Sequence, residues 1–221
     1  MKAYRPGLLS VTALTLALIA ADKPADRLIL FDGQNLDGWK RLETFKAGTV
    51  SVEGGCLVIK PGGPISGVAS TRADLPTTDY ELSYEAKRTE GSDFFAAATF
   101  PVGASFLTFV NGGWGGGVTG LSSINGADAS ENESRRYVKY QDQTWYRFRI
   151  QVTAKVVRCW VDDKAILAVN HEGQQLKTRI ETRPSQPLGF TTYRSAGMIR
   201  VVEIRNLTAN EVDAVNNSAE P

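Results

Sequence analysis

The chain has 221 residues, with 25 basic and 24 acidic side chains and one histidine, so its net charge at neutral pH is +1. This length suits one large domain with a hydrophobic core, and a second folded domain is not expected. Nearly balanced charge excludes the concentrated positive field that nucleic-acid binding needs. Two cysteines are too few for a disulfide framework, so Cys56 and Cys159 either pair with each other or stay as two buried thiols.

The first 21 residues have the pattern of a cleaved export signal. Two basic residues precede an apolar run over residues 8–20, which ends in small residues. The run is too short to span a bilayer as a retained helix, and a buried core helix does not explain its basic start. We therefore expect a periplasmic or secreted protein with no transmembrane span once residues 1–21 are removed.

The mature chain opens with its most distinctive segment, residues 28–40, which read LILFDGQNLDGWK. Its two Asp-Gly pairs supply the positive φ that tight turns need, so each pair predicts a reversal of the chain. The segment resembles the opening of the 3-keto-disaccharide hydrolase domain family, which includes 3-keto-glucoside lyases and hydratases. The resemblance extends over residues 28–207, and implies a concanavalin A-like jelly roll that acts on oxidised sugars.

Beyond this opening, short β segments alternate with clusters of Gly, Pro, Asn and Asp, and no amphipathic helix is recognisable. The chain is therefore predicted to be all-β, with one sandwich domain over residues 22–209 and a frayed polar tail over residues 210–221. Strands are expected at residues 28–31, 49–53, 56–60, 68–71, 80–88, 94–100, 105–110, 136–140, 145–153, 156–161, 165–169, 188–193 and 199–206.

Alternation within three of these strands predicts which side chains face the core, because neighbouring side chains on a strand point to opposite faces. Residues 80–88, 145–153 and 156–161 each have one apolar face and one face rich in charged residues or tryptophan. Two antiparallel sheets packed through their apolar faces satisfy this pattern. We expect Tyr84, Phe148, Ile150 and Val161 between the sheets, and Arg147 and Arg149 outside.

Residues 111–120 hold six glycines around Trp114. Glycine lets the backbone bend sharply and lets a ligand come close, and the GK(S/T) ending of a phosphate loop is absent. An aromatic ring also matches the apolar C–H face of a pyranose. Trp114 is therefore either a platform for a sugar at the edge of a cleft or a side chain that plugs the edge of the core.

Residues 128–133, which follow the glycine-rich segment, include four oxygen-rich side chains and precede two arginines. Such a loop can present carboxylates to a sugar or to a hard cation such as Ca²⁺, although its spacing is not that of an EF-hand. A solvated acidic loop is the alternative, and no other cofactor is expected. The four side chains are Asp128, Glu131, Asn132 and Glu133.

The family resemblance implies a site for a 3-keto-glycoside. A base removes the C2 proton, which the C3 ketone makes acidic, while a positive group stabilises the enolate oxygen and the C1 substituent leaves. We expect Glu85 or Glu131 as the base and Arg147 or Arg149 as the positive group, on the polar face of one sheet. The sugar-contacting residues are expected to be Trp114, Trp160, Asp128, Asn132, Glu133 and Tyr193.

The sequence leaves three functional classes open. Enzymatic members of the family show an Asn-Ser-Gly-Ile-type strand and a Gly-Tyr-Glu-Val-type strand in mid-domain, but residues 94–100 and 106–110 lack those polar side chains. The chain is therefore a 3-keto-glycoside hydrolase or lyase, a non-catalytic carbohydrate-binding module, or a structural envelope protein. Carbohydrate is the expected partner, whereas the sugar, the metal and the oligomeric state are not determined by the sequence.

Overall fold

The computed structural model describes Met1 and residues 27–218. The predicted export signal therefore lies, apart from Met1, outside the described residues, as do the last three residues of the tail. Among the described residues, no helix is long and apolar enough to cross a membrane.

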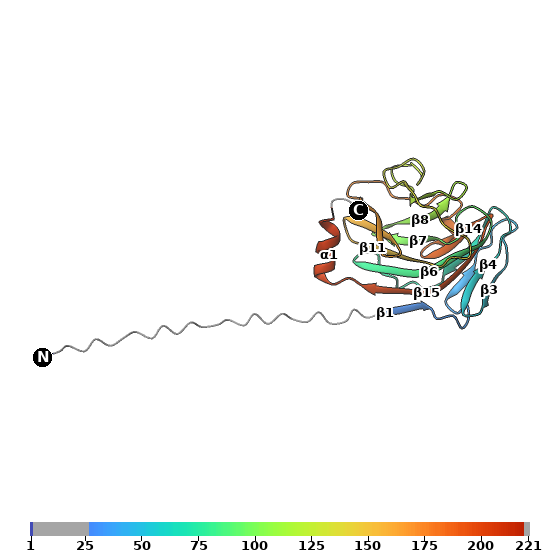
Figure 1. Ribbon diagram of the computed structural model, residues 1–221, viewed down its shortest axis with the longest axis horizontal. Helices are drawn as coiled ribbons and strands as arrows, with labels where there is room; N and C mark the ends of the chain where they lie inside the picture. Colours follow the sequence, from blue (N-terminus) through green and yellow to red (C-terminus); the bar gives the residue numbers. More distant parts are fainter. Residues whose placement is uncertain (2–26, 219–221) are drawn as a thin grey trace.

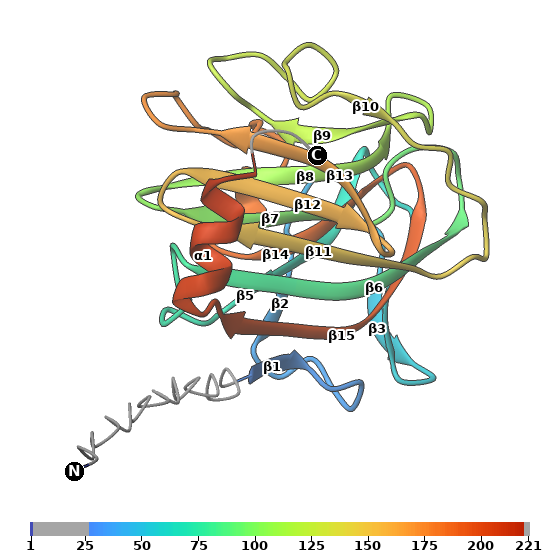
Figure 2. The same ribbon diagram turned by 60° about the vertical axis from the view of Figure 1, so that its left-hand side comes forward.

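Two antiparallel sheets lie face to face (Figures 1 and 2). The eight-stranded sheet has the order β13 (Lys164–Asn170), β12 (Val156–Val161), β11 (Tyr146–Val152), β6 (Tyr80–Glu90), β15 (Ala196–Asn206), β4 (Cys56–Ile59) and β3 (Val50–Glu53), with β1 (Arg27–Phe31) paired to β15. The seven-stranded sheet has the order β10 (Arg136–Tyr137), β9 (Val118–Ser122), β8 (Ser105–Gly113), β7 (Ala97–Val102), β14 (Gly189–Tyr193), β5 (Ile65–Ser70) and β2 (Trp39–Arg41).

Aromatic rings fill the space between the sheets. Tyr84 on β6 lies opposite Phe148 on β11, and their rings stack with centroids 5.0 Å apart. Phe190, from β14 of the other sheet, meets the Tyr84 ring edge-on at 4.8 Å. Tyr84, Phe148, Ile150 and Val161 are all buried, whereas Arg147 and Arg149 point outward. The alternation therefore predicted both the sandwich and its buried face correctly.

The opening motif carries the chain from one sheet to the other, since β1 and β2 belong to different sheets. Gly38 has a φ of +81°, as its predicted turn requires, and the Trp39 backbone N–H donates to the Leu36 carbonyl at 2.9 Å. The Trp39 indole N–H donates to the Leu30 carbonyl at 2.8 Å, and its ring packs on Phe190. The motif thus links the two sheets and has a structural role.

Two strands, β2 and β9, fall outside the expected set. The glycine-rich composition of residues 111–120 suggested a loop, but β8 and β9 continue through most of it as a hairpin. Gly120 packs closely there, since a Cβ atom would lie 3.0 Å from the Ser134 hydroxyl oxygen. Close packing over the strand, rather than flexibility, explains this glycine.

Residues 210–216 of the expected frayed tail instead belong to helix α1 (Ala209–Asn216) at one end of the sandwich (Figure 1). The Thr208 hydroxyl accepts from the Glu211 backbone N–H, and the Glu211 carboxylate accepts from the Thr208 backbone N–H. This capping box satisfies two backbone donors that a helix start otherwise leaves unpaired. Burial of Val215 and a bidentate ion pair between Glu211 and Arg205 hold the helix against the sheet.

Both cysteines are buried free thiols. Cys159 lies in the core, where burial raises the pKa of its thiol. The structure therefore selects the unpaired alternative of the two that the sequence left open.

Replacing Phe148 with Ala should lower the free energy of unfolding by about 3–5 kcal/mol, because transfer energy is lost and a cavity is left among the aromatic rings. Denaturant titration measures this loss. Arg147→Ala, at the neighbouring exposed position, is the control and should change stability by about 0.5 kcal/mol or less. Equal effects of the two substitutions would contradict the predicted core.

The contribution of helix α1 to stability should depend on pH. Hydrogen bonding to Arg205 lowers the pKa of Glu211 from 4.5 to about 2. The ion pair therefore contributes fully above pH 4.5, and its contribution is lost as the pH falls through about 2. Glu211→Gln should destabilise the protein at neutral pH, and the difference from the parent should shrink over this range. Glu131→Gln, in an exposed loop, should show no such convergence.

Candidate functional site

The polar face predicted to hold the site is the outer face of the eight-stranded sheet, and its charges neutralise one another. Glu85 pairs with Arg200 at 2.7 Å. Glu81 is buried and accepts hydrogen bonds from Arg149, Gln151 and Arg205. These carboxylates are therefore already engaged by cations or amide groups of the same face, as is usual on a solvated surface.

Trp160, predicted to be a sugar platform, lies on this face but is only 8% exposed. The guanidinium groups of Arg149 and Arg158 lie over its ring, 4.6 and 4.8 Å from the centroid. Trp145 is covered in the same way by Arg200 at 4.1 Å. These cation–π contacts fill the positions that a sugar ring would need.

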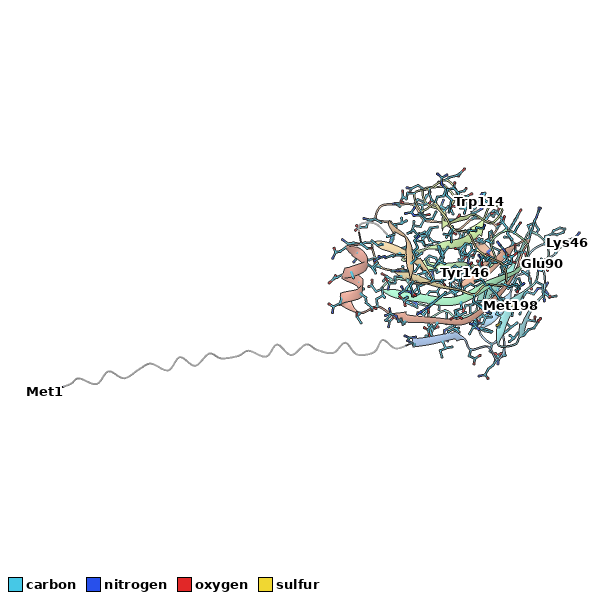
Figure 3. All side chains as sticks on the ribbon, in the orientation of Figure 1. Met1, Lys46, Glu90, Trp114, Tyr146 and Met198 are labelled. Carbon is cyan, nitrogen blue, oxygen red and sulfur yellow. The ribbon has the colours of Figure 1, made fainter. Side chains whose placement is uncertain are left out.

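A cavity of about 230 Å³ lies instead on the outer face of the seven-stranded sheet. We call it the Trp114 cavity. Strands supply its floor through Ile65, Thr108, Val110, Ser122 and Tyr193, and loops supply its rim through Asp93, Phe94, Trp114, Arg179, Glu181 and Thr182. The expected site therefore divides: Trp114 and Tyr193 line the cavity, while Glu85, Arg147, Arg149 and Trp160 lie on the opposite face of the sandwich. Figure 3 shows Trp114 well away from Met198, which belongs to β15 of the eight-stranded sheet.

Small and hydroxyl-bearing side chains on the outward positions of this sheet make room for the cavity. A chain of hydroxyl contacts links Ser185 to Thr99 at 2.8 Å, Thr99 to Thr108 at 2.9 Å and Thr108 to Thr182 at 3.1 Å. Thr182 and Ser185 belong to the segment around the 3₁₀ helix η1 (Arg183–Ser185). The segment is thereby fixed across the sheet, and it forms one wall of the cavity.

Trp114 is held at the tip of the β8–β9 hairpin. Its φ is +52°, a conformation that bulky residues seldom adopt, and its side chain is 45% exposed. The Asp93 carboxylate accepts from the Gly115 backbone N–H at 2.8 Å and ties the tip to the β6–β7 loop. Gly116 is required beside it because a Cβ would lie 2.8 Å from the Ser92 carbonyl oxygen. The hairpin thus presents a half-exposed indole in a fixed position, as a binding platform requires.

Sequence reasoning missed Arg179, as it missed Asp93 and Glu181 in the same cavity. Its guanidinium donates to both carboxylate oxygens of Glu181, at 3.2 and 3.0 Å, and to Asp128, and it lies 5.9 Å from the Trp114 ring centroid. Hydrogen bonding between the two side chains raises the pKa of Arg179 and lowers that of Glu181. Both groups are therefore charged in the cavity at neutral pH.

The predicted oxygen-rich loop lies next to the cavity, but most of its side chains already form hydrogen bonds within the protein. Asp128 accepts from Ser122, Ser123 and Arg179, and the Asn132 amide donates to two backbone carbonyls. Glu131 is exposed, and Glu133 accepts from Gln174. Over residues 27–218, no three His, Cys, Asp or Glu side chains group as they would around a metal ion, so calcium binding stays a prediction.

One signal for the covered face was present in the sequence. Ala97, Thr99, Thr108, Gly67 and Ala69 all lie outward, and each is buried. Outward positions on exposed strands are usually polar and large, so small side chains at the alternate, outward positions indicate that loops cover the strand. That pattern distinguishes the seven-stranded sheet from the eight-stranded one.

Several solved structures share this architecture at low sequence identity. Domain 4 of AbnA, a GH43 extracellular arabinanase from Geobacillus stearothermophilus solved with arabinotriose, is 14% identical with a TM-score of 0.55, over 87% of this chain and 98% of that one. The Crh5 transglycosylase solved with NAG is 14% identical with a TM-score of 0.54, over 84% and 85%. The carbohydrate-binding module CBM66 from Bacillus subtilis is 12% identical with a TM-score of 0.50, over 76% and 96%.

These likenesses place the fold in the concanavalin-like jelly-roll class found in glycosyl hydrolases and carbohydrate-binding modules. The chain belongs to the 3-keto-alpha-glucoside-1,2-lyase-like domain family, which its residues 28–209 match. The resemblance read from the opening motif is thereby confirmed. Among curated proteins, no relative is found.

Proposed function

We propose that this protein binds a saccharide in the Trp114 cavity. The observation that carries the proposal is the half-exposed Trp114, held in a left-handed backbone conformation beside two carboxylates and a guanidinium. Phe94 and Tyr193 extend the aromatic lining, and their rings lie 5.8 Å apart. Aromatic faces match the C–H groups of a sugar, while charged acceptors and donors match its hydroxyl groups.

A second function, elimination on a 3-keto-glycoside, is supported by the family and by the state of Asp93. The carboxylate oxygens of Asp93 accept from the backbone N–H groups of Phe94 and Gly115, and no cation pairs with it among the described residues. Glu181 is a weaker candidate for the base because Arg179 binds both of its oxygens and lowers its pKa. Asp93 is therefore the better base in this cavity.

In this reaction the Asp93 carboxylate takes the proton from C2 of the sugar. The electron pair of that C–H bond forms a double bond between C2 and C3, and the C3 ketone becomes an enolate. The C3 carbonyl then re-forms as the pair moves into a double bond between C1 and C2, and the C1–O bond breaks. Water protonates the departing oxygen, and Asp93 later returns its proton to solvent. Arg179 keeps two N–H donors beyond its three hydrogen bonds and stabilises the enolate oxygen.

Both functions would operate outside the cytoplasm if residues 1–21 act as the export signal that their pattern predicts. The mass of the mature chain recovered from the cell envelope or medium tests this part of the proposal.

Trp114→Ala should weaken saccharide binding by about tenfold or more, because the stacking platform is lost. Titration calorimetry against cello-, malto- and laminari-oligosaccharides measures the affinity. Trp145→Ala is the matched control, since Trp145 lies under Arg200 on the other face of the sandwich. Failure of the parent protein to bind any of these sugars, or equal loss in both variants, would reject the cavity as the binding site.

Asp93→Asn should slow elimination on a 3-keto-glucoside with a chromogenic leaving group by about 10²–10⁴-fold, the usual contribution of a positioned base. Sugar affinity should change far less. Glu85→Gln removes the base candidate on the opposite face and should leave the rate unchanged. Turnover that survives Asp93→Asn would place the base elsewhere, and a parent that binds sugar without turnover would leave the binding function alone.

A further inference from the structure

A second hollow, of about 380 Å³, lies on the other side of the η1 segment. Ser105, Phe106, Lys177, Thr178, Arg183 and Gln186 line it. The segment around η1 therefore has two sides: Arg179, Glu181 and Thr182 line the Trp114 cavity, whereas Lys177 and Arg183 line the second hollow.

The two hollows carry opposite charge. Asp93, Glu181 and Arg179 give the Trp114 cavity one net negative charge, and Asp128 adds another beside it. The second hollow has two cations and no carboxylate in its lining. Within residues 27–218, neither Lys177 nor Arg183 has a carboxylate partner or a side-chain hydrogen bond, although Arg179 nearby has two carboxylate partners.

The hollows also lie a short distance apart along β8, on either side of the η1 segment. Phe106 lines the second hollow and Thr108 lines the cavity, and these residues are successive outward positions of β8. Two residues along a strand span about 7 Å, a distance that one sugar ring covers. The Ser105 hydroxyl donates to the Leu176 carbonyl and the Gln186 amide donates to the Thr178 hydroxyl, so each keeps an oxygen that can accept from a sugar hydroxyl. The Phe106 ring beside them is partly exposed.

We propose that the second hollow is a subsite for an anionic sugar residue, whose carboxylate or sulfate pairs with Lys177 and Arg183 while a neutral residue of the same oligosaccharide occupies the Trp114 cavity. The proposal rests on saccharide binding in that cavity. It defines the preferred ligand as an acidic oligosaccharide whose negative charge lies next to the residue bound at Trp114. The negative charge of the cavity itself disfavours the reverse placement.

Matched pairs of oligosaccharides test this subsite. Cellotriose and maltotriose are each compared with the same trisaccharide oxidised to a uronate at C6 of one terminal residue, by titration calorimetry at low salt. The uronate form of the sugar that binds should be held roughly tenfold more tightly, as expected for a charge-assisted hydrogen bond. Added salt should reduce this preference because it screens exposed charges. A 6-sulfated terminal residue distinguishes sulfate from carboxylate as the preferred anion.

The double variant Lys177→Ala/Arg183→Ala should lose the preference for the uronate and keep the affinity for the neutral sugar. Lys177→Arg/Arg183→Lys retains both charges and should keep the preference, and Arg147→Ala on the opposite face is the control for loss of one surface cation. Thermal unfolding of each variant checks its fold. Equal affinity for both members of a pair, or a preference unchanged in the double variant, would overturn the subsite and leave the proposed function standing. Absence of binding by either member of both pairs would overturn the proposed function and the subsite together.

Discussion

The contact between the Tyr84, Phe148 and Phe190 rings fixes the architecture, because it joins the two sheets at the centre of the sandwich. Each sheet must bury one face, and large flat rings supply much apolar area for each residue. Because side chains alternate along a strand, fixing Phe148 inward also fixes Arg147 and Arg149 outward. The same constraint on β8 places Phe109 inward and Thr108 outward, which brings Thr108 to the floor of the cavity.

The two outward faces that result have different chemistry. On the eight-stranded sheet, long charged side chains pair with one another and cover the tryptophans, so the face is filled by its own residues. On the seven-stranded sheet the outward side chains are small, and loops approach closely enough to enclose a cavity. Side-chain size on the outward positions, more than polarity, therefore distinguishes the face that carries the Trp114 cavity.

The sequence allowed the core to be predicted because hydrophobic alternation records the direction of each side chain within its own strand. It could not assign the outward faces, since alternation does not tell which of two sheets a strand joins. Glu85 and Trp114 were therefore placed together although the sandwich separates them. Arg179 has one local partner, Glu181, but its contacts with Asp128 and Trp114, which place it at the cavity, are distant in sequence. Helix α1 was missed even though Thr208 and Glu211 have the spacing of a capping box, since its apolar content is small.

The position of Arg179 has a further thermodynamic consequence. One guanidinium supports the Asp128 loop, binds Glu181 and lies by the Trp114 ring, so the loop and the cavity share a single cation. Under the proposed function, a ligand that takes hydrogen bonds from Arg179 competes with Asp128 for the same guanidinium. Linkage between two equilibria is reciprocal, so ligand binding and order of the Asp128 loop would each change the free energy of the other by the same amount. A substitution in the loop would then change the affinity of the cavity.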